Sequence, residues 1–365
     1  MTARFATEPP YQHGQAPRCA VLYCNLGTPD SPSTADVRRF LREFLSDPRV
    51  VEIPRLIWLM ILHGIILRFR PAKSAAKYAS IWTPEGSPLK VWTEKQSKLL
   101  QGWLAQRGHH VQVRYAMRYG STSIASQLDA LHQEGTTRVL IVPAYPQYSA
   151  TTTASLFDAV YAWAGKTRNL PELRFINHYH DDARYIEALA SKVRQYWQQN
   201  GQPDLLMMSF HGVPERTLHL GDPYHCECFK TARLLAQALS LKAEQYKVTF
   251  QSRLGRAKWL EPYTDATLIA LGKQGLGRVD VICPAFTSDC LETLEEINME
   301  GRAEFLVAGG KEFHYISCLN DDPGFITALC ALTEQHLQGW PTTVAPEPAS
   351  LDASRAAAKA LGAKH

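Results

Sequence analysis

No stretch of this sequence stays apolar for long enough to cross a lipid bilayer. The longest apolar run is LIWLMILHGIIL, residues 56–67, and His63 and Gly64 interrupt it. A spanning helix needs about 20 consecutive apolar residues. The first 17 residues also lack the apolar core of a secretory signal peptide. We therefore expect a cytoplasmic protein, in which residues 56–67 can still touch a membrane surface peripherally.

The chain also carries little net charge, with a formal value of +4 for 365 residues. Nucleic-acid binding needs a broad basic field, which so small a charge does not provide, so no nucleic-acid partner is expected. Hydrophobic residues make up 45% and charged residues 20%, as in ordinary globular proteins. The length exceeds what one ordinary core needs, and two domains are expected.

The eight cysteines show no repeating short spacing. Cys19, Cys24 and Cys283 lie in or beside apolar segments, which is more typical of free thiols in a reducing compartment than of a disulfide framework. Cys226 and Cys228 are close enough in sequence to make a metal site conceivable. Two thiolates alone do not complete an iron–sulfur site.

Short β-branched and apolar runs alternate with helical patterns along the chain. Several runs are apolar without alternation, as expected for parallel strands buried on both faces. The pattern predicts an α/β protein whose eight strands form two parallel sheets of about four strands each, divided near residue 165. Strands are predicted at 19–27, 110–117, 138–146, 173–179, 204–212, 246–252, 279–286 and 313–319, and helices at 35–45, 94–107, 122–134, 183–199, 230–239 and 264–274.

Two tails differ from the rest of the chain in composition. Residues 1–17 are polar and contain proline, and residues 341–365 are rich in alanine and proline with few large apolar groups. Both are expected to be disordered. Between them, ligands of doubly wound sheets bind at the carboxyl ends of the strands, so the residues that follow each strand are the place to look for chemistry.

The motif Ser209-Phe210-His211-Gly212 follows the apolar run DLLMM. It places an imidazole at the carboxyl edge of the second sheet, before a glycine that permits a sharp turn. Imidazole titrates near neutrality and binds borderline metals, so His211 suits proton abstraction or metal handling. A histidine that only hydrogen-bonds a loop explains the position at least as well, and the motif alone does not decide between the two.

A second polar group follows the predicted strand that ends at Phe286. Asp289 can cap a helix there, along which Glu292, Glu296 and Glu300 recur every four residues on one face. In a crevice with little water, such carboxylates raise one another's pKa and form a row able to hold and pass protons. The alternative is structural, because Glu292 would close a capping box with Asp289 and the later glutamates would face solvent.

Position in the predicted sheet favours the functional interpretation of both groups. His211 and Glu292 each follow a strand that ends at the same edge of the same sheet. Both should therefore open into one crevice. A base and a carboxylate that face each other are a better catalytic candidate than either residue alone.

Two further features fit a flat, greasy ligand that carries carboxylates. The apolar segment 56–67 leads through several cations to Gly86-Ser87-Pro88-Leu89, which predicts an apolar lip edged with positive charge; the cations are Arg68, Arg70, Lys73 and Lys77. A buried amphipathic helix with a solvated basic end is an equally good interpretation. Trp259 could stack on an aromatic macrocycle, although a lone tryptophan is more often part of a core.

Taken together, these segments resemble the ferrochelatase family, in variants that look bacterial. The resemblance covers nearly all of residues 20–335, and eight segments stand in the family's order. They are NLGTPDSPSTADVRRFLREFLSDPRVVEIPR (25–55), GSPLKVWT (86–93), MRYG (117–120), YPQYS (145–149), SFHG (209–212), GDPYHC (221–226), QSRLGRAKWLEPYTD (251–265) and AFTSDCLETLEEI (285–297).

The resemblance implies a class II chelatase fold with two Rossmann-like domains and a porphyrin cleft between them. The first domain would span residues 18–165 plus a C-terminal helix at about 325–338, and the second residues 166–324. The implied activity is that of a lyase that inserts Fe²⁺ into protoporphyrin IX, the last step of haem biosynthesis. The resemblance also implies that the segment near 56–70 covers the macrocycle and, in membrane-associated relatives, contacts lipid. Porphyrin transfer from the preceding oxidase of the pathway would then be a natural partnership.

The same resemblance assigns roles to individual residues. His211 and Glu292 would form the catalytic pair and meet the metal, followed by Glu296 and Glu300 on the acidic track. The residues implied to bind the porphyrin are Ser87, Trp259 and Phe286. Animal relatives with a [2Fe–2S] cluster have cysteine directly after YPQYS and three more near the C-terminus. Here that position is Ala150 and no cysteine follows Cys330, so we expect no such cluster and no other cofactor, Fe²⁺ being a substrate.

Iron insertion requires that two pyrrole protons leave the ring while the metal loses its water ligands. We expect the site to bind a distorted macrocycle, closer to the transition state. His211 would accept pyrrole protons, and the glutamate row would export protons or deliver iron. Because the base must be neutral, activity should fall as the pH drops below the pKa of His211.

Three other functions stay open at this stage. A related chelatase of the same fold would use coproporphyrin III, or sirohydrochlorin with cobalt. A non-enzymatic haem carrier would bind haem without making it and would not need the acidic row. A nucleotide-dependent oxidoreductase is disfavoured, because Asn25-Leu26-Gly27-Thr28-Pro29 after the first strand lacks the G-x-G-x-x-G that a pyrophosphate requires.

Overall fold

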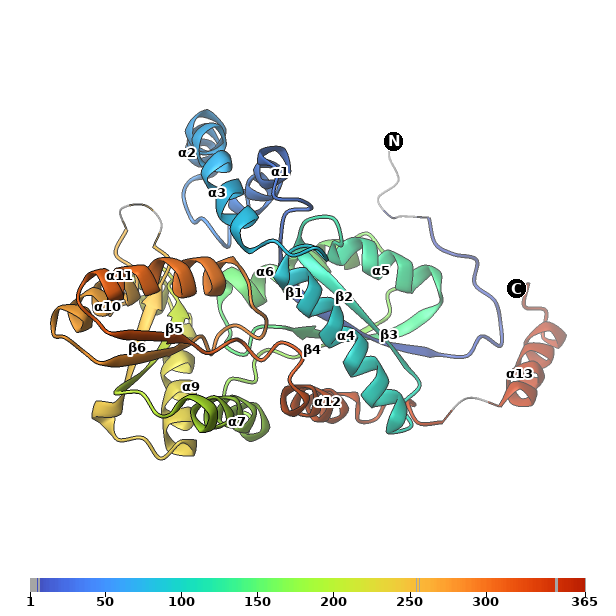
Figure 1. The fold of residues 1–365 in the computed structure, drawn as a ribbon. Coiled ribbons are helices and arrows are strands. Elements are labelled where there is room, and N and C mark those ends of the chain that lie inside the picture. The colour runs from blue at the N-terminus through green and yellow to red at the C-terminus, as the bar shows by residue number, and fades with distance from the viewer. Residues whose placement is uncertain (1–4, 6, 254, 256, 345–346, 365) are drawn as a thin grey trace.

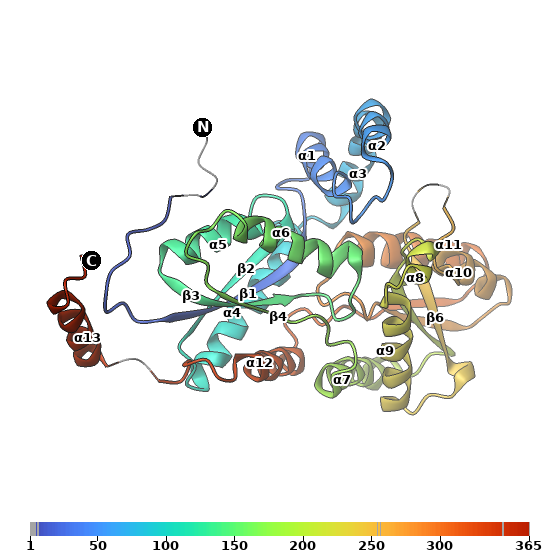
Figure 2. The same ribbon diagram turned by 180° about the vertical axis from the view of Figure 1, so that it is seen from behind.

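In the computed structural model the chain forms two parallel sheets, each covered by helices on both faces (Figures 1 and 2). The structure describes residues 5, 7–253, 255, 257–344 and 347–364. The first sheet has the strand order β2-β1-β3-β4, and the second repeats it as β6-β5-β7-β8. The strands are β1 (Arg18–Gly27), β2 (Val111–Tyr119), β3 (Thr136–Pro143), β4 (Glu172–Phe175), β5 (Leu205–His211), β6 (Tyr246–Gln251), β7 (Arg278–Ile282) and β8 (Glu312–Tyr315).

Helices connect the strands, and several of them bury the apolar faces of the two sheets. They are α1 (Thr34–Leu45), α2 (Arg55–Ile61), η1 (Leu62–Ile66), α3 (Leu67–Ile81), α4 (Pro88–Gln106), α5 (Ile124–Gln133), η2 (Ala150–Ala154), α6 (Ser155–Ala164), α7 (Ala183–Asn200), α8 (Glu215–His219), α9 (Tyr224–Ala238), η3 (Ala243–Gln245), α10 (Thr264–Lys273), η4 (Glu292–Gly301), α11 (Arg302–Val307), α12 (Pro323–Leu337) and α13 (Pro348–Ala360).

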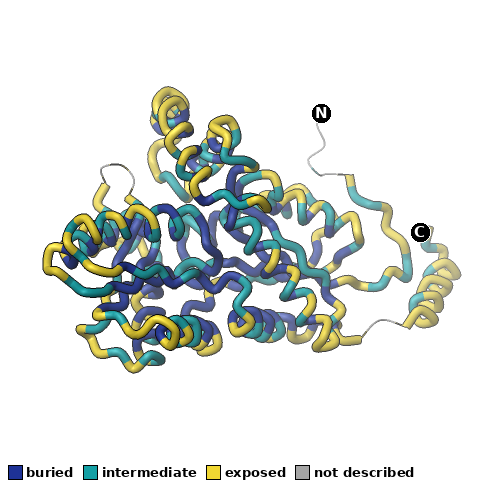
Figure 3. The backbone as a smooth tube through the Cα atoms, viewed as in Figure 1, coloured by how far each residue is buried: buried dark blue, intermediate teal, exposed yellow. Residues whose placement is uncertain are grey.

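The predicted α/β class with two parallel four-stranded sheets is confirmed. Its physical basis is visible in β1 and β5. Residues 20–24 and 205–210 are buried without alternation, because helices cover both faces of each sheet (Figure 3). Strands of this kind read as continuous apolar runs rather than as alternating ones.

The domain boundary expected near residue 165 lies too early. β4 begins at Glu172, pairs with β3 and belongs to the first sheet. The chain passes to the second sheet through α7. After the last strand of that sheet, α12 returns to pack against α4 and β3 of the first domain as well as against α7. The two sheets also share one continuous core, in which Tyr23 of β1 and Phe210 of β5 belong to the same buried cluster.

The C-terminal segment was expected to be disordered, but its described part is partly helical. Its described part contains α13, a helix with no buried residue, which lies away from both sheets (Figure 1). The Arg355 Nε atom on α13 donates a hydrogen bond of 2.9 Å to the carbonyl of His13. At the other end of the chain Glu8 accepts a hydrogen bond from the backbone of Asn169. Residues 1–4, 6, 345–346 and 365 lie outside the described part of the chain.

Candidate active site at the edge of the second sheet

His211 is the last residue of β5, one of the two inner strands of the second sheet, and it pairs in register with Gln251 of β6. The ring is half-buried, and its Nδ1 atom lies 2.6 Å from the carbonyl oxygen of Gly212. A carbonyl can only accept a hydrogen bond, so Nδ1 carries the proton. In the neutral ring the lone pair is therefore on Nε2, where it can accept a proton or bind a metal ion.

Position 212 requires glycine because there is no room for a Cβ atom, and not because the backbone is left-handed there. Its φ is not in the positive range, and a Cβ atom there would lie 2.7 Å from the Gln251 carbonyl and 3.3 Å from Cε3 of Trp259. The Gly212 N–H also donates a hydrogen bond of 2.6 Å to the same carbonyl. The sharp turn expected from sequence is thus a close approach of β6 and Trp259 to the backbone next to His211.

The strand predicted over 279–286 ends at Ile282, and a mostly buried loop leads from it to η4. Asp289 anchors this loop. Its carboxylate accepts hydrogen bonds from Asn320 Nδ2 (2.6 Å), the Tyr315 hydroxyl (2.5 Å) and the Cys318 N–H (3.2 Å). The Asp289 N–H is donated to Asn320 Oδ1, so it does not serve a capping box with Glu292. The structural alternative for Glu292 is therefore not supported.

The helix that carries the glutamates, η4, is a π-helix. In a π-helix the hydrogen bonds close over five residues, so side chains five apart become neighbours. Lys77 Nζ lies 2.9 Å from Glu295 Oε2 and 2.7 Å from Glu300 Oε1. Lys77 therefore bridges Glu295 and Glu300, and Glu300 does not continue a row with Glu292 and Glu296. This corrects the four-residue periodicity expected from sequence.

Glu296 lies with His211 and Glu292. Burial raises the pKa of the Glu296 carboxyl and the charge of Glu292 adds to this, while a hydrogen bond from Ser252 Oγ and the charge of His211 act in the opposite direction. The charges of His211 and Glu292 act on the Glu296 carboxyl because the three groups lie near one another. The structure thus brings His211, Glu292 and Glu296 together at one edge of the second sheet.

Gln251 holds this arrangement in place, a role that sequence reasoning missed. Ser209 Oγ donates to Gln251 Oε1 (2.8 Å), and Gln251 Nε2 donates to the backbone carbonyl of Glu292 (2.8 Å). Gln251 and Ser209 are both buried. The serine of the SFHG segment therefore positions η4 through Gln251. The signal in sequence was that both residues lie near the carboxyl ends of consecutive predicted strands, 204–212 and 246–252.

The first domain approaches the same site through Tyr78 of α3, which sequence reasoning also missed. Burial raises the pKa of the Tyr78 hydroxyl, and the charges of Glu292 and Cys290 add to the effect, while a hydrogen bond with Thr28 opposes it. Thr28 Oγ1 in turn donates to Ser87 Oγ (2.8 Å) at the start of α4. Ser87 is buried, and Thr28 links it to the Tyr78 hydroxyl, on which the charge of Glu292 acts.

One aromatic ring lies near His211 and a second lies against the neighbouring Gly212. The Phe286 ring is tilted by 53° at a centroid distance of 6.4 Å from the His211 ring. Trp259 packs over Gly212, and its neighbour Leu260 donates a backbone hydrogen bond to the Val213 carbonyl. Both rings are half-buried. The two rings expected to meet a macrocycle thus lie close to His211 and Gly212.

The expected apolar lip consists of α2, η1 and the start of α3, which stand out from the two sheets together with α1 (Figures 1 and 2). Its inner face packs Trp58 and Leu62 against Leu45. Its outer face exposes large apolar side chains, with Leu56 81% and Phe69 71% accessible; Ile57, Met60 and Ile65 are exposed as well. Among the described residues, no helix is both long and apolar enough to cross a membrane.

Two expectations about charged and metal-binding groups need correction. Lys77 was expected to edge the lip as a cation for ligand carboxylates, but it pairs with Glu295 and Glu300. Cys226 and Cys228 both lie on α9, where Cys226 is exposed and Cys228 is buried. Residues two apart on a helix do not face each other, so the two thiols do not form a shared metal site.

Comparisons with known proteins identify the family to which the chain is similar. The family model described as ferrochelatase matches residues 18–337. The ferrochelatase of Methylibium petroleiphilum is 65% identical over 361 residues, which cover 99% of this chain and 99% of that protein. The ferrochelatase of a Polaromonas species is 64% identical over 363 residues, covering 98% and 99%. Among solved structures, SirB from Bacillus subtilis with Fe³⁺ has the same fold, with a TM-score of 0.50, 13% identity and coverage of 88% and 96%.

Proposed function

The chain belongs to the ferrochelatase family and is an enzyme that inserts ferrous iron into a porphyrin for haem synthesis, and we propose that His211 is the base of this reaction. The observation that carries the proposal is the orientation of its ring, whose Nδ1–H is donated to the Gly212 carbonyl. This leaves the Nε2 lone pair as the proton acceptor. Insertion of Fe²⁺ into the neutral porphyrin forms the bonds from iron to nitrogen and releases two protons, which Nε2 takes up from the pyrrole nitrogens in turn.

Glu296 and Glu292 are proposed to receive these protons from His211 and to lead them away from the ring. A carboxyl group whose pKa is raised holds a proton more readily than an ordinary glutamate, and burial raises the pKa of Glu296. The same carboxylates, with the Nε2 lone pair, supply the nitrogen and oxygen ligands that Fe²⁺ accepts. Glu295 and Glu300 with Lys77 form the next polar group along η4 and are proposed to take part in iron delivery.

Protoporphyrin IX is the porphyrin we propose, bound against Trp259 and Phe286 with Ser87 at its rim. Coproporphyrin III carries two propionates more, which would need additional cations. Lys77, one of the four cations of the lip, is engaged by two glutamates. The exposed lip residues Leu56 and Phe69 are apolar, which favours the porphyrin with fewer charged groups. Anaerobic incubation with Fe²⁺ and either porphyrin, followed by loss of free-base fluorescence, tests the proposal. A higher kcat/KM for coproporphyrin III than for protoporphyrin IX would contradict it.

Substitution of the proposed base gives the direct test of the mechanism. His211→Ala should lower kcat by about 100-fold or more, because a positioned general base contributes roughly 10²–10⁴-fold. Glu292→Gln keeps the side-chain shape and should lower kcat by about 100-fold as well. His219→Ala, at an exposed histidine of α8, is the matched control and should retain the parent rate. A folded His211→Ala or Glu292→Gln enzyme with nearly the parent rate would show that the pair is assigned wrongly.

The lip is proposed to rest on a membrane surface, where porphyrin would arrive from the preceding oxidase. Its exposed apolar face supports this proposal. The double variant Leu56→Ser with Phe69→Ser should lose binding to phospholipid vesicles in a sedimentation assay while retaining its fold. Leu220→Ser, at an exposed leucine in the second domain, is the control. Equal vesicle binding by parent and double variant would exclude the lip as the contact.

A cytoplasmic location and the absence of a [2Fe–2S] cluster are kept as proposals. Seven of the eight cysteines are buried, which fits a reducing compartment. Ala150, at the position where cluster-bearing relatives have cysteine, opens η2 and donates its N–H to the Asp222 carboxylate (2.7 Å). Analysis of iron and acid-labile sulfide in the purified chain tests the absence of the cluster. Two iron atoms per chain with matching sulfide would contradict it.

A further inference from the structure

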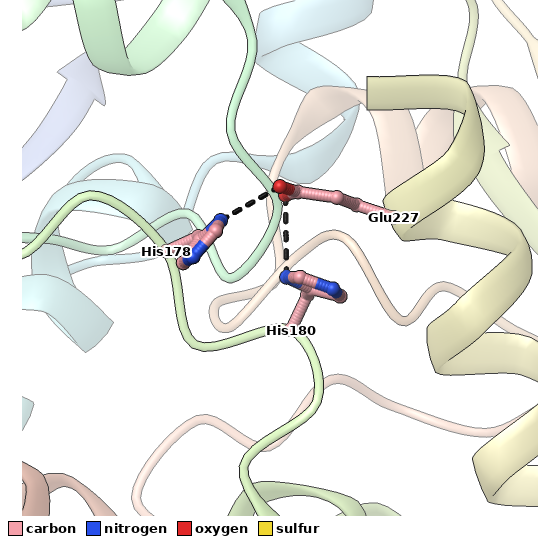
Figure 4. Close-up of side chains that lie close together, drawn as sticks. All are labelled: His178, His180 and Glu227. Atoms are coloured by element: carbon pink, nitrogen blue, oxygen red, sulfur yellow. Dashed lines mark hydrogen bonds and ion pairs between the residues drawn. The ribbon is translucent and has the colours of Figure 1, made fainter. Parts of the chain in front are cut away.

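A second group of metal-ligating side chains lies outside the site just described, between the two domains. His178 and His180 belong to the segment that follows β4 of the first sheet, and Glu227 lies in the first turn of α9 in the second domain. Figure 4 shows both imidazole rings directed toward the same carboxylate. None of these residues shares a role with His211 or the glutamates of η4.

The three side chains are close enough to hold one ion. His178 Nδ1 lies 2.7 Å from Glu227 Oε1, and His180 Nδ1 lies 3.3 Å from Glu227 Oε2. One ligand atom from each residue lies within 4.8 Å of the others. Ligands bound at about 2.0–2.2 Å from one ion lie roughly 3–4 Å apart, so a small inward movement completes the geometry.

His180 supplies an independent sign of a missing ligand. Its side chain is only 6% exposed, and its Nδ1 atom is a buried polar atom without a hydrogen bond. Although Nδ1 faces Glu227 at 3.3 Å, the angles are not those of a hydrogen bond. Buried polar atoms are almost always satisfied in native proteins. Burial also lowers the pKa of His180, which favours the neutral ring that a metal ion requires.

We infer that His178, His180 and Glu227 bind one divalent transition-metal ion of the borderline class, such as Zn²⁺ or Co²⁺. Two imidazoles and one carboxylate are a recurrent ligand set for such ions. The ion would lie between His178 Nδ1 and the Glu227 carboxylate, and the proton of the neutral His178 ring would then be on Nε2. The His178 side chain is 45% exposed, which leaves the remaining coordination positions open to water on that side.

Hydrogen bonds and an ion pair around the three side chains hold the proposed ligands in place. The Tyr148 N–H donates a hydrogen bond of 2.7 Å to Glu227 Oε2, and the Thr231 hydroxyl of α9 donates one of 2.8 Å to the His180 carbonyl. The neighbouring Asp181 pairs with Lys230 at 2.6 Å. These bonds fix the ligands on both sides of the domain junction. A bound ion would therefore fasten α9 to the segment after β4 and stabilise the contact between the domains.

Equilibrium dialysis of the full chain against Zn²⁺, without porphyrin, tests the inference. His178→Ala and Glu227→Gln should each lose one equivalent of bound Zn²⁺, or bind it about 100-fold more weakly, since even outer partners of a metal ligand contribute 10–100-fold. His211→Ala should retain this equivalent, because it affects the other site. Zn²⁺ should raise the thermal unfolding midpoint of the parent and not that of His178→Ala.

Two control variants separate this site from other ligands. His219→Ala removes an exposed histidine elsewhere, and Cys226→Ser removes the exposed thiol next to Glu227; both should bind Zn²⁺ as the parent does. Because His178 is half exposed, its replacement should leave the fold intact, as circular dichroism can verify. Equal Zn²⁺ binding by His178→Ala and the parent would overturn the inference, as would loss of the equivalent in Cys226→Ser. Neither result bears on His211, so the chelatase proposal is judged separately.

Discussion

The proton on Nδ1 of His211 determines what this residue can do. Because Nδ1–H is donated to the Gly212 carbonyl, the free lone pair of the neutral ring is on Nε2, and the backbone rather than another side chain sets the tautomer. Gly212 must be glycine for the two strands to approach this closely. Gly212 therefore serves His211 twice, since its carbonyl sets the tautomer of the ring and its missing side chain lets β6 approach.

Glu296 gives a prediction about stability and pH. Its pKa is raised in the folded chain, so the folded state binds the proton more tightly than the unfolded state. The resulting stabilisation is complete below the unfolded pKa of glutamate and is lost as the pH rises through the folded pKa. Glu296→Gln cannot ionise, so its stability relative to the parent should be higher at pH 8 than at pH 4.

Urea unfolding of both proteins at the two pH values measures this difference. Gln keeps an acceptor for Ser252 Oγ, so the substitution removes the charge with little other change. Glu244→Gln, at an exposed glutamate of η3, is the control and should show no comparable dependence on pH. A constant difference between Glu296→Gln and the parent across the pH range would contradict the assignment.

At the scale of elements, the π-helix η4 decides which glutamates act together. A regular α-helix would align Glu292, Glu296 and Glu300 on one face. The π-helical spacing instead turns Glu300 toward Glu295 and Lys77, and leaves Glu292 and Glu296 beside His211. One element thus carries two separate acidic groups.

This division predicts different kinetic effects along η4. Glu296→Gln should lower kcat about tenfold or more, because Glu296 lies beside the proposed base. Glu300→Gln should leave kcat within about twofold of the parent and change mainly the KM for Fe²⁺. Steady-state assays with Fe²⁺ varied at saturating porphyrin separate the two effects. A loss of kcat in Glu300→Gln equal to that in Glu296→Gln would favour a single continuous row.

At the scale of the whole molecule, Gln96 of α4 joins the two domains. It is fully buried, and its Nε2 donates to the carbonyls of Thr287 (2.9 Å) and Asn320 (2.8 Å) in the second domain. Its Oε1 accepts from the hydroxyls of Tyr23 (3.0 Å) and Ser288 (3.1 Å). The loop that leads to Glu292 is thereby held against the first domain.

Gln96→Ala should therefore lower the free energy of unfolding by about 3 kcal/mol, since it leaves several buried polar groups without partners. It should also lower chelatase activity, because the loop before η4 loses its anchor. Gln106→Ala, at the exposed end of the same helix, should change stability by less than about 0.5 kcal/mol. Equilibrium denaturation measures both. A loss below about 1 kcal/mol for Gln96→Ala would show that these contacts contribute little.

The sequence by itself determined the fold class and most element positions, because apolar burial on both faces of a parallel strand leaves a local pattern in the chain. Helices predicted at 35–45, 183–199 and 264–274 correspond closely to α1, α7 and α10. It also indicated that His211 and Glu292 meet at one sheet edge, since the carboxyl ends of parallel strands lie together. The resemblance to the ferrochelatase family followed from eight short motifs that stand in the family's order along the chain.

Tertiary structure decided the rest, because hydrogen bonds and charges depend on partners far away in sequence. The π-helical spacing that separates Glu300 from Glu296, and the pairing of Lys77 with residues over 200 positions away, leave no periodic signal. β4 joined the first sheet by pairing with β3. His178, His180 and Glu227 came together only because the segment after β4 packs on α9, across the junction of the two domains.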